Sequence, residues 1–194
     1  YTTAVNFTSG QSTTTLTTVL TRAGVTAITA GDGTTSGPAS SNLTVNPGAV
    51  TKLVVTLPGE TFLPGSGNTG TPTAQTAGTS FVITSITATD VYFNEVLSYN
   101  GLKTINYTGP SGAPSYTTAV NFTSGQSTTT LTTTLKKAET TAITAGDGTT
   151  TGPASSSLTV NVGAFTKLQI LVPGETAAPG SATGKTGTPT AQTA

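Results

Sequence analysis

Apolar and polar side chains alternate at many points along this chain, and the alternation has the two-residue period of a β-strand. Leu53, Val55 and Leu57 occupy every second position, and so do Val120 and Phe122. Successive side chains of a strand point to opposite faces, so each run predicts a strand with one buried face and one wet face. Nowhere does the apolar pattern take the helical period of three and four residues. The chain is therefore expected to be all-β.

The strands are expected to be short, because turn residues interrupt the alternation at regular spacing. In residues 80–89 the apolar positions slip by one residue between Ile83 and Ile86, which predicts a β-bulge in one long strand. The Pro- and Gly-rich stretch from Pro58 to Pro72 is predicted to be a loop. Seven or eight such strands favour a sandwich of two sheets. The other expected strands are 53–57, 96–99, 105–107, 120–122, 127–135, 142–145 and 158–160, and residues 73–77 are a candidate for one more short strand.

The sequence repeats itself. Residues 1–18 read YTTAVNFTSGQSTTTLTT, and the same letters return at residues 116–133, an offset of 115. The motifs AITAGDGTT, GPASS, TKL and PGET recur with the same offset. TGTPTAQTA recurs with an offset of 117, so two residues are inserted before its second copy, and an insertion marks a loop. A period near 115 residues is too long for a solenoid coil and suits one β-sandwich domain.

The predicted boundaries of the repeat do not coincide with the two ends of the chain. Seams at residues 46–49 and 161–164 each lie between two alternating strands. Residues 51–165 then form one complete repeat, residues 1–50 the C-terminal part of one repeat, and residues 166–194 the N-terminal part of the next. A partial sandwich exposes its core and its strand edges. We therefore expect self-association or neighbouring repeats, end to end, to complete both partial repeats.

Composition narrows the function classes. Only 7% of the residues are charged, seven basic residues balance seven acidic ones, and 34% are hydrophobic. β-Branched Thr favours strands, and its hydroxyl keeps an outer face wet. Nucleic acid binding requires a basic patch, which this composition excludes. No apolar run is long enough to span a membrane, and without Cys there is neither a disulfide framework nor a thiolate metal site.

Several segments of the complete repeat are similar to a known kind of module. They are the opening LVVTLP, the strand AGTSFVITSITATD, Tyr99 with Gly101, and ITAGDGTTTGPASSSLTV. Together they resemble the bacterial immunoglobulin-like tandem repeats of large cell-surface proteins, which form adhesin or stalk-type arrays. The resemblance extends over both partial repeats. It implies immunoglobulin-like β-sandwich repeats in tandem, about 115 residues each, that serve as spacer, stalk or adhesive array at the cell surface.

The chain lacks the groups that most catalytic sites need. It contains no His and no Cys, so neither a Ser-His-Asp nor a Cys-His arrangement can be built from it. Its many Ser and Thr hydroxyls have no residue placed to activate them, and they are interpreted as surface groups on strands. We therefore expect no enzyme activity and no cofactor.

The carboxylates are expected to stabilise turns rather than to bind a metal. Gly-Asp-Gly occurs once in each copy, and an Asp between two strands most simply bonds its own backbone. Asp90 and Glu95 flank one turn and could share a cation, but Ca²⁺ takes six to eight oxygens and two carboxylates supply too few. No metal site is predicted. The repeated acidic pairs are Asp32 with Asp147 and Glu60 with Glu175.

The sequence contains residues suited to two covalent modifications, an isopeptide bond and N-glycosylation. Lys52 and Asn161 lie at the ends of the first and last strands, where an intramolecular isopeptide bond could form, but a strand start and a strand end would lie at opposite poles. A surface Lys and a turn Asn are favoured. Four Asn-x-Thr triplets match the N-glycosylation pattern and matter only in a source that glycosylates secreted proteins. Their acceptors are Asn6, Asn42, Asn106 and Asn121.

The aromatic residues divide into core and surface. Phe81, Tyr107 and Phe122 fall on alternating apolar positions and are expected in the core. Tyr92 and Phe93 lie beside a turn and are the candidates for an exposed contact. The expected function is a structural spacer or fibre-forming segment of an extracellular, cell-surface repeat protein. The alternative is an adhesin that binds carbohydrate or host and cell-surface partners.

Overall fold

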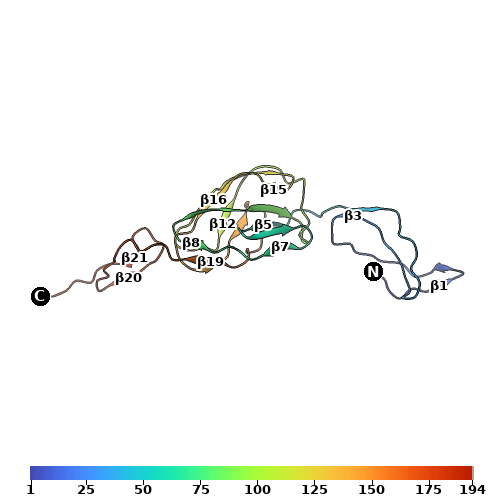
Figure 1. Ribbon diagram of the computed structural model, residues 1–194, viewed down its shortest axis with the longest axis horizontal. Coiled ribbons are helices and arrows are strands. Elements are labelled where there is room, and N and C mark those ends of the chain that lie inside the picture. The colour runs from blue at the N-terminus through green and yellow to red at the C-terminus, as the bar shows by residue number, and fades with distance from the viewer. Residues whose placement is uncertain (194) are drawn as a thin grey trace. The chain divides into compact units, whose positions relative to one another are not determined.

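The computed structural model describes residues 1–193 and divides the chain into an N-terminal part, Tyr1–Pro47, and a main part, Gly48–Ala194. The division falls within the first predicted seam, and no division occurs at the second. The described residues form strands, turns and loops, with no helix among them. The all-β expectation is therefore confirmed. The arrangement of the main part, with strands of several sheets around one core, is consistent with a β-sandwich (Figure 1).

The largest sheet of the main part has five antiparallel strands in the order β11-β14-β15-β10-β5. Strands β5 and β10 pair along their whole length, from Thr56 opposite Ser85 to Lys52 opposite Thr89. The strands are β5 (Lys52–Thr56), β10 (Ser85–Thr89), β11 (Gly101–Thr104), β14 (Ala119–Thr123) and β15 (Gln126–Ser127).

Smaller sheets supply the other strands of the main part. The orders are β13-β16-β9, β17-β19-β8, β12-β18 and β6-β7. Strand β8 runs parallel to β19, and the other paired strands are antiparallel. Their bounds are β6 (Glu60–Leu63), β7 (Gly67–Gly70), β8 (Gln75–Thr76), β9 (Ser80–Ile83), β12 (Asn106–Thr108), β13 (Ser115–Tyr116), β16 (Leu131–Thr134), β17 (Thr140–Thr141), β18 (Thr144–Gly146) and β19 (Leu158–Asn161).

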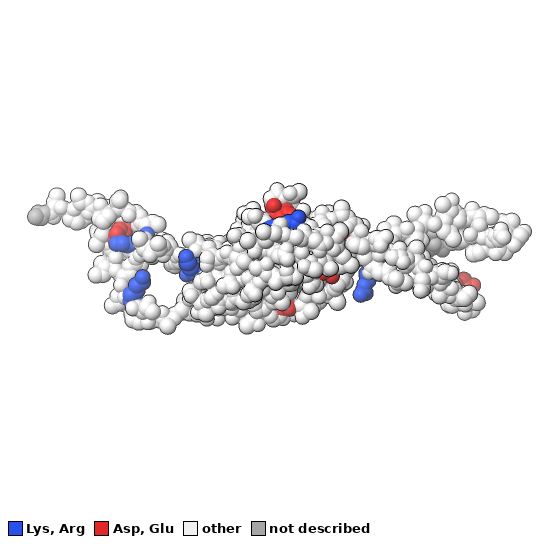
Figure 2. Space-filling model, turned by 90° about the horizontal axis from the view of Figure 1, so that it is seen from above, with Lys and Arg blue, Asp and Glu red and all other residues white. Residues whose placement is uncertain are grey.

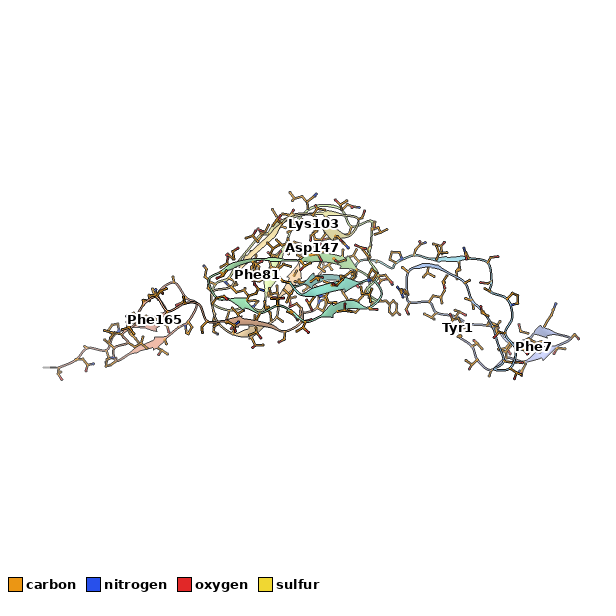
Figure 3. The ribbon with its side chains drawn as sticks, viewed as in Figure 1. Tyr1, Phe7, Phe81, Lys103, Asp147 and Phe165 are labelled. Atoms are coloured by element: carbon orange, nitrogen blue, oxygen red, sulfur yellow. The ribbon has the colours of Figure 1, made fainter. Side chains whose placement is uncertain are left out.

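One hydrophobic core joins these sheets, and the alternating residues build it. Phe122 is buried as predicted, whereas Tyr107 is half-buried and packs against the core. Phe81, labelled in Figure 3, is half-buried in the same way. Removing apolar side chains from water is the main stabilising contribution to such a fold. The core consists of Leu53, Val55, Leu57, Ile83, Ile86, Ala88, Ile105, Val120, Phe122, Leu131, Leu135, Ile143, Ala145, Leu158 and Val160.

Four sequence expectations were wrong in detail. Residues 127–135 are not one strand, because they are divided between β15 and β16, which belong to different sheets. The slip within residues 80–89 is a change of sheet and not a bulge, because the chain leaves the β9 sheet at Thr84 and enters the β10 sheet. Ile83 and Ile86 both reach the core because the strand crosses from one sheet to the other. Residues 96–99 form a turn in which Tyr99 N–H donates to Val96 O at 3.0 Å. Residues 58–72 contain the β6–β7 hairpin, closed by left-handed glycines.

The N-terminal part forms two hairpins without a core of their own. Its strands are β1 (Phe7–Thr8), β2 (Gln11–Ser12), β3 (Gly24–Thr26) and β4 (Leu43–Val45). β1 pairs with β2 and β3 with β4. Phe7 corresponds to Phe122 in the repeat but is 68% exposed, against 1% for Phe122. The local turns of a sandwich therefore form here without its buried interior.

Residues 166–172 continue the chain beyond the second seam and form no strand. Leu168 corresponds to Leu53, the first core residue of the complete repeat, but is 88% exposed where Leu53 is fully buried. The hairpin that follows does form. It consists of β20 (Glu175–Ala177) and β21 (Lys185–Gly187), the counterparts of β6 and β7.

Candidate functional site

The turn at residues 90–94 is held by one buried carboxylate. Asp90 is 3% exposed, and its Oδ1 accepts hydrogen bonds from the backbone N–H of Tyr92 at 2.8 Å and of Asn94 at 2.9 Å. Its Oδ2 accepts from the Asn94 side-chain amide and from the Gly48 N–H, both at 2.9 Å. Asp90 therefore ties the turn to the start of the main part, 42 residues earlier.

The surroundings of Asp90 do not suit a cation. Burial raises its pKa, but the hydrogen bonds from Asn94, Gly48 and Tyr92 outweigh burial and hold the pKa below its ordinary value. Both oxygens already face N–H donors, which a cation would have to displace. The pKa of Glu95 is raised by burial, against a hydrogen bond from Gln126. Within residues 1–193 no three His, Cys, Asp or Glu side chains come together as metal ligands.

Phe93 adopts a left-handed backbone conformation, with φ of 63°. This conformation is uncommon for a bulky residue and stores strain that the surrounding structure must offset. Lys52 Nζ lies 3.6 Å from the centre of the Phe93 ring and donates to Val91 O at 2.6 Å. The Phe93 carbonyl accepts from Gly65 N–H at 2.9 Å. The Phe93 ring is therefore held between Lys52 of β5 and the β6–β7 hairpin.

A cavity of about 220 Å³ lies beside the Phe93 ring. Of the two predicted contact residues, Phe93 lines it, whereas Tyr92 is 49% exposed and does not. The walls combine one aromatic ring with hydroxyls and an amide, groups that can contact a sugar. The lining residues are Val54, Val55, Ser66, Gly67, Asn68, Phe93, Pro153, Ala154, Ser155 and Ser156.

Glu60 is buried and bonds to two residues that line this cavity, Asn68 and Ser156. One carboxylate oxygen accepts from Leu57 N–H at 2.9 Å and from the Asn68 amide at 3.5 Å, and the other accepts from the Ser156 hydroxyl. Asn68 also donates to Val55 O at 2.7 Å, which occupies an acceptor on the free edge of β5. The Glu60 carboxylate therefore joins the beginning and the end of the complete repeat.

The Gly-Asp-Gly turns form as predicted. Asp147 Oδ1 accepts from the N–H groups of Thr149 at 2.9 Å and Thr150 at 2.7 Å. Asp32 makes the same two bonds, to Thr34 and Thr35, at the same distances. In the complete repeat the other Asp147 oxygen accepts from the Tyr99 hydroxyl at 2.6 Å. Each of these carboxylates is used to hold backbone.

The two modification hypotheses meet different environments. Lys52 Nζ is engaged by Val91 and Phe93, while Asn161 is exposed and its carbonyl accepts from Ala77 N–H at 2.9 Å. The structure does not bring this pair together for an isopeptide bond. The four acceptors of the glycosylation triplets are all exposed, so the sugar attachment stays a prediction for Asn6, Asn42, Asn106 and Asn121.

Sequence reasoning missed the two long-range carboxylate bonds. Asp90 with Gly48 and Glu60 with Ser156 are distant in the chain, and no local motif pairs them. One signal was available, because Glu60 and Ser156 both recur 115 residues away, as Glu175 and Ser41. A polar residue that both copies retain was a candidate for a shared structural bond.

Charged residues are few and scattered on the face drawn in Figure 2. Within residues 1–193, Lys137 forms an ion pair with Glu139 at 3.1 Å, and Lys185 forms one with Glu175 at 2.6 Å. Among the residues described, no helix has the length and apolar character to cross a membrane. The face drawn in Figure 2 therefore carries no extended charged patch.

Comparison with known proteins adds no relative: no family model, curated protein or solved structure matches this chain.

Proposed function

We propose that this chain is a structural spacer segment of an extracellular, cell-surface protein, built from immunoglobulin-like β-sandwich repeats in tandem. The observation that carries the proposal is that two copies of the repeat form the same turns, with matching hydrogen bonds, at two places in the chain. In such an array each repeat adds length, and no copy is specialised for a ligand. A spacer uses many interchangeable domains in a line, which an enzyme does not need.

Matching hydrogen bonds support the equivalence of the copies. Asn121 N–H donates to Thr129 Oγ1 at 2.9 Å, and the counterpart bond from Asn6 to Thr14 has the same length. Ile143 N–H donates to Ser155 Oγ at 2.9 Å, and the counterpart from Ile28 to Ser40 measures 3.0 Å. These turns form both in the complete repeat, which has a buried core, and in the N-terminal part, which has none. The local sequence is therefore sufficient to determine them.

The use of the acidic groups supports a structural role. Glu60, Asp90 and Asp147 are each saturated by donors from the backbone or from neighbouring side chains. A general acid or base needs a carboxyl group that can reach a substrate proton. In this chain the same groups hold turns and tie distant segments, which suits a passive module.

Single-molecule stretching tests the proposal. Tandem proteins of residues 48–162 preserve the Gly48–Asp90 bond at every junction. We expect evenly spaced unfolding events, one for each copy, because the repeats fold as separate units. Each event should release about 400 Å of chain, at roughly 3.6 Å for each residue of the repeat. Irregular spacing, or fewer events than copies, would refute an array of independent sandwiches.

The second candidate is an adhesin, and the cavity beside Phe93 favours it. The Phe93 ring and the Ser66 hydroxyl line this cavity, and both are groups that contact sugars. Screening the 194-residue protein and its Phe93→Ala variant on a glycan array tests this function. Saturable binding that the variant loses, and that a Phe165→Ala control retains, would support an adhesin. Absence of binding to every glycan would remove it.

A further inference from the structure

Two glycines bring a loop of the complete repeat against the hairpin of the following one. Gly112 lies in the loop at residues 109–114, and Gly180 lies in the turn between β20 and β21. Both are left-handed, with φ of 74° and 81°. A Cβ atom on Gly112 would lie 3.1 Å from the Gly180 Cα, and one on Gly180 would lie 2.9 Å from the Gly112 Cα. The two backbones are therefore in direct contact.

A polar network fixes the loop that receives Gly180. Glu139 accepts from the N–H and the hydroxyl of Ser111, each at 2.7 Å. Lys137 Nζ donates to Ser111 Oγ at 3.0 Å and lies 3.1 Å from Glu139. The Lys137 Cβ would itself lie 2.8 Å from a Cβ on Gly180. The loop is thus held in place by the strand connection that also contacts the hairpin.

The hairpin turn has the same form in both copies. Gly65, the counterpart of Gly180, is also left-handed, with φ of 78°. Ser66 N–H donates to Leu63 O at 3.0 Å, and Ser181 N–H donates to Ala178 O at 3.2 Å. A turn with one shape in every repeat can contact the preceding repeat in one manner. This makes the hairpin a suitable element for a joint.

Differences between the copies concentrate on the two sides of this contact. Residues 1–50 and 116–165 differ at nine positions, five of which lie in the segment that contains Lys137 and Glu139. The hairpin changes as well, from Phe62-Leu63 to Ala177-Ala178, and it carries the two inserted residues. The core residues of 116–165 are identical to their counterparts in 1–50, whereas Val55 and Leu57 correspond to Ile170 and Val172. The five pairs are Val19 and Thr134, Thr21 and Lys136, Arg22 and Lys137, Gly24 and Glu139, and Val25 and Thr140.

We propose that the loop at residues 109–114, with Lys137 and Glu139, is a seat for the β20–β21 hairpin of the next repeat and sets the angle between successive repeats. This inference rests on the proposed spacer function and gives it a joint. Copies that share most of their core residues but differ at the joint can therefore differ in their angle to the neighbouring repeat. Glycine is required on both sides, because a side chain on either would have to displace backbone.

Nuclear Overhauser effects test the joint. The Hα protons of Gly112 and Gly180 should give a cross-peak, because the Cα of each lies within 3.1 Å of the position that a Cβ would take on the other. Gly148 is the control: it is equally left-handed, with φ of 88°, nothing lies within 4 Å of its Cβ position, and its Hα protons should give no cross-peak to Gly180. Absence of the Gly112–Gly180 cross-peak from the assigned spectrum would overturn the joint.

A steric variant gives a second readout. Gly180→Val should shift the amide resonances of residues 109–114 and of Lys137, because it separates the two backbones. Gly78→Val, with φ of 82° and open space around it, introduces the same backbone strain and should leave those resonances unchanged. Unchanged resonances in Gly180→Val would contradict the seat.

The experiments distinguish an error in the proposed joint from an error in the proposed spacer function. If tandem proteins unfold as independent repeats but the Gly112–Gly180 cross-peak is absent, the joint is wrong and the spacer stands. If the cross-peak is present but the tandem proteins do not unfold repeat by repeat, the contact is real and the spacer is wrong.

Discussion

The hydroxyl of Tyr99 lies 2.6 Å from Oδ2 of Asp147, 48 residues later in the chain. The Tyr99 ring meets Phe122 edge to face, with 4.9 Å between ring centres, and Lys103 Nζ lies 4.8 Å from the Tyr99 ring. One side chain therefore links the core, the five-stranded sheet and the Gly-Asp-Gly turn. The copy of that turn at Asp32 keeps its two backbone bonds with no tyrosine bond among them.

Tyr99→Phe removes this single hydrogen bond and leaves the ring packing in place. We expect the free energy of unfolding of the main part to fall by about 1–2 kcal/mol, since the acceptor is a carboxylate. Urea unfolding followed by far-ultraviolet circular dichroism measures the change. Tyr92→Phe, at an exposed position in the turn, is the matched control and should leave the midpoint unchanged. Equal effects of the two variants would contradict the role of Asp147.

Phe122→Ala and Phe7→Ala make the same change in two copies of one motif. Phe122 is buried in the core, so its truncation should cost about 3–5 kcal/mol. Phe7 is 68% exposed, so its truncation should leave the main unfolding transition in place. Thermal unfolding of both variants provides the comparison. A large loss in Phe7→Ala would mean that the N-terminal part contributes to the main core.

Glu60→Gln tests the long-range bond with Ser156. The Gln oxygen can keep the bond from Leu57 N–H, and the Ser156 hydroxyl can turn to accept from the Gln NH2 group. A charge-assisted bond is thereby replaced by a neutral one, at a cost of about 1 kcal/mol. Ser156→Ala removes the same bond from the other side, and the double variant should cost less than the sum of the singles. Glu175→Gln, in the copy whose carboxylate pairs with Lys185, should not move the unfolding midpoint of the complete repeat. Strict additivity of the Glu60 and Ser156 variants would contradict their coupling.

Stability should fall in alkaline solution. Burial raises the pKa of Tyr107 from 10.0 to about 12, and it also raises the pKa values of Tyr99 and Tyr116. The folded state therefore keeps its phenol protons in a range where the unfolded chain has lost them. This stabilisation is complete below pH 10 and is lost as the pH rises towards 12. Denaturant midpoints measured across this range should decline, and less steeply in Tyr107→Phe; a constant midpoint would contradict the burial of these phenols.

Much of the fold could be predicted from local patterns, because alternation reports which face of a strand is buried. Leu53, Val55, Val120 and Phe122 are core residues for that reason. The repeat also predicted that the Asp32 and Asp147 turns would match. What local patterns could not predict is how distant segments meet.

The candidate site was less predictable for the same physical reason. Phe93 was found from its place beside a turn, but its partners Lys52 and Gly65 come from elsewhere in the chain. The Pro- and Gly-rich letters of residues 58–72 are shared by loops and by tight hairpins, so composition could not show that β6 and β7 pair. Apolar phase alone likewise could not separate a bulge from the change of sheet at Thr84.

The central claim is that the repeat adds length, and X-ray scattering from tandem proteins of two, four and eight copies of residues 48–162 tests it most directly. If each repeat is a spacer with a defined joint, the maximum dimension should increase by a constant amount for each added copy. A flexible string of domains would instead grow roughly as the square root of copy number. Square-root growth, or a dimension that stops increasing with added copies, would contradict the account.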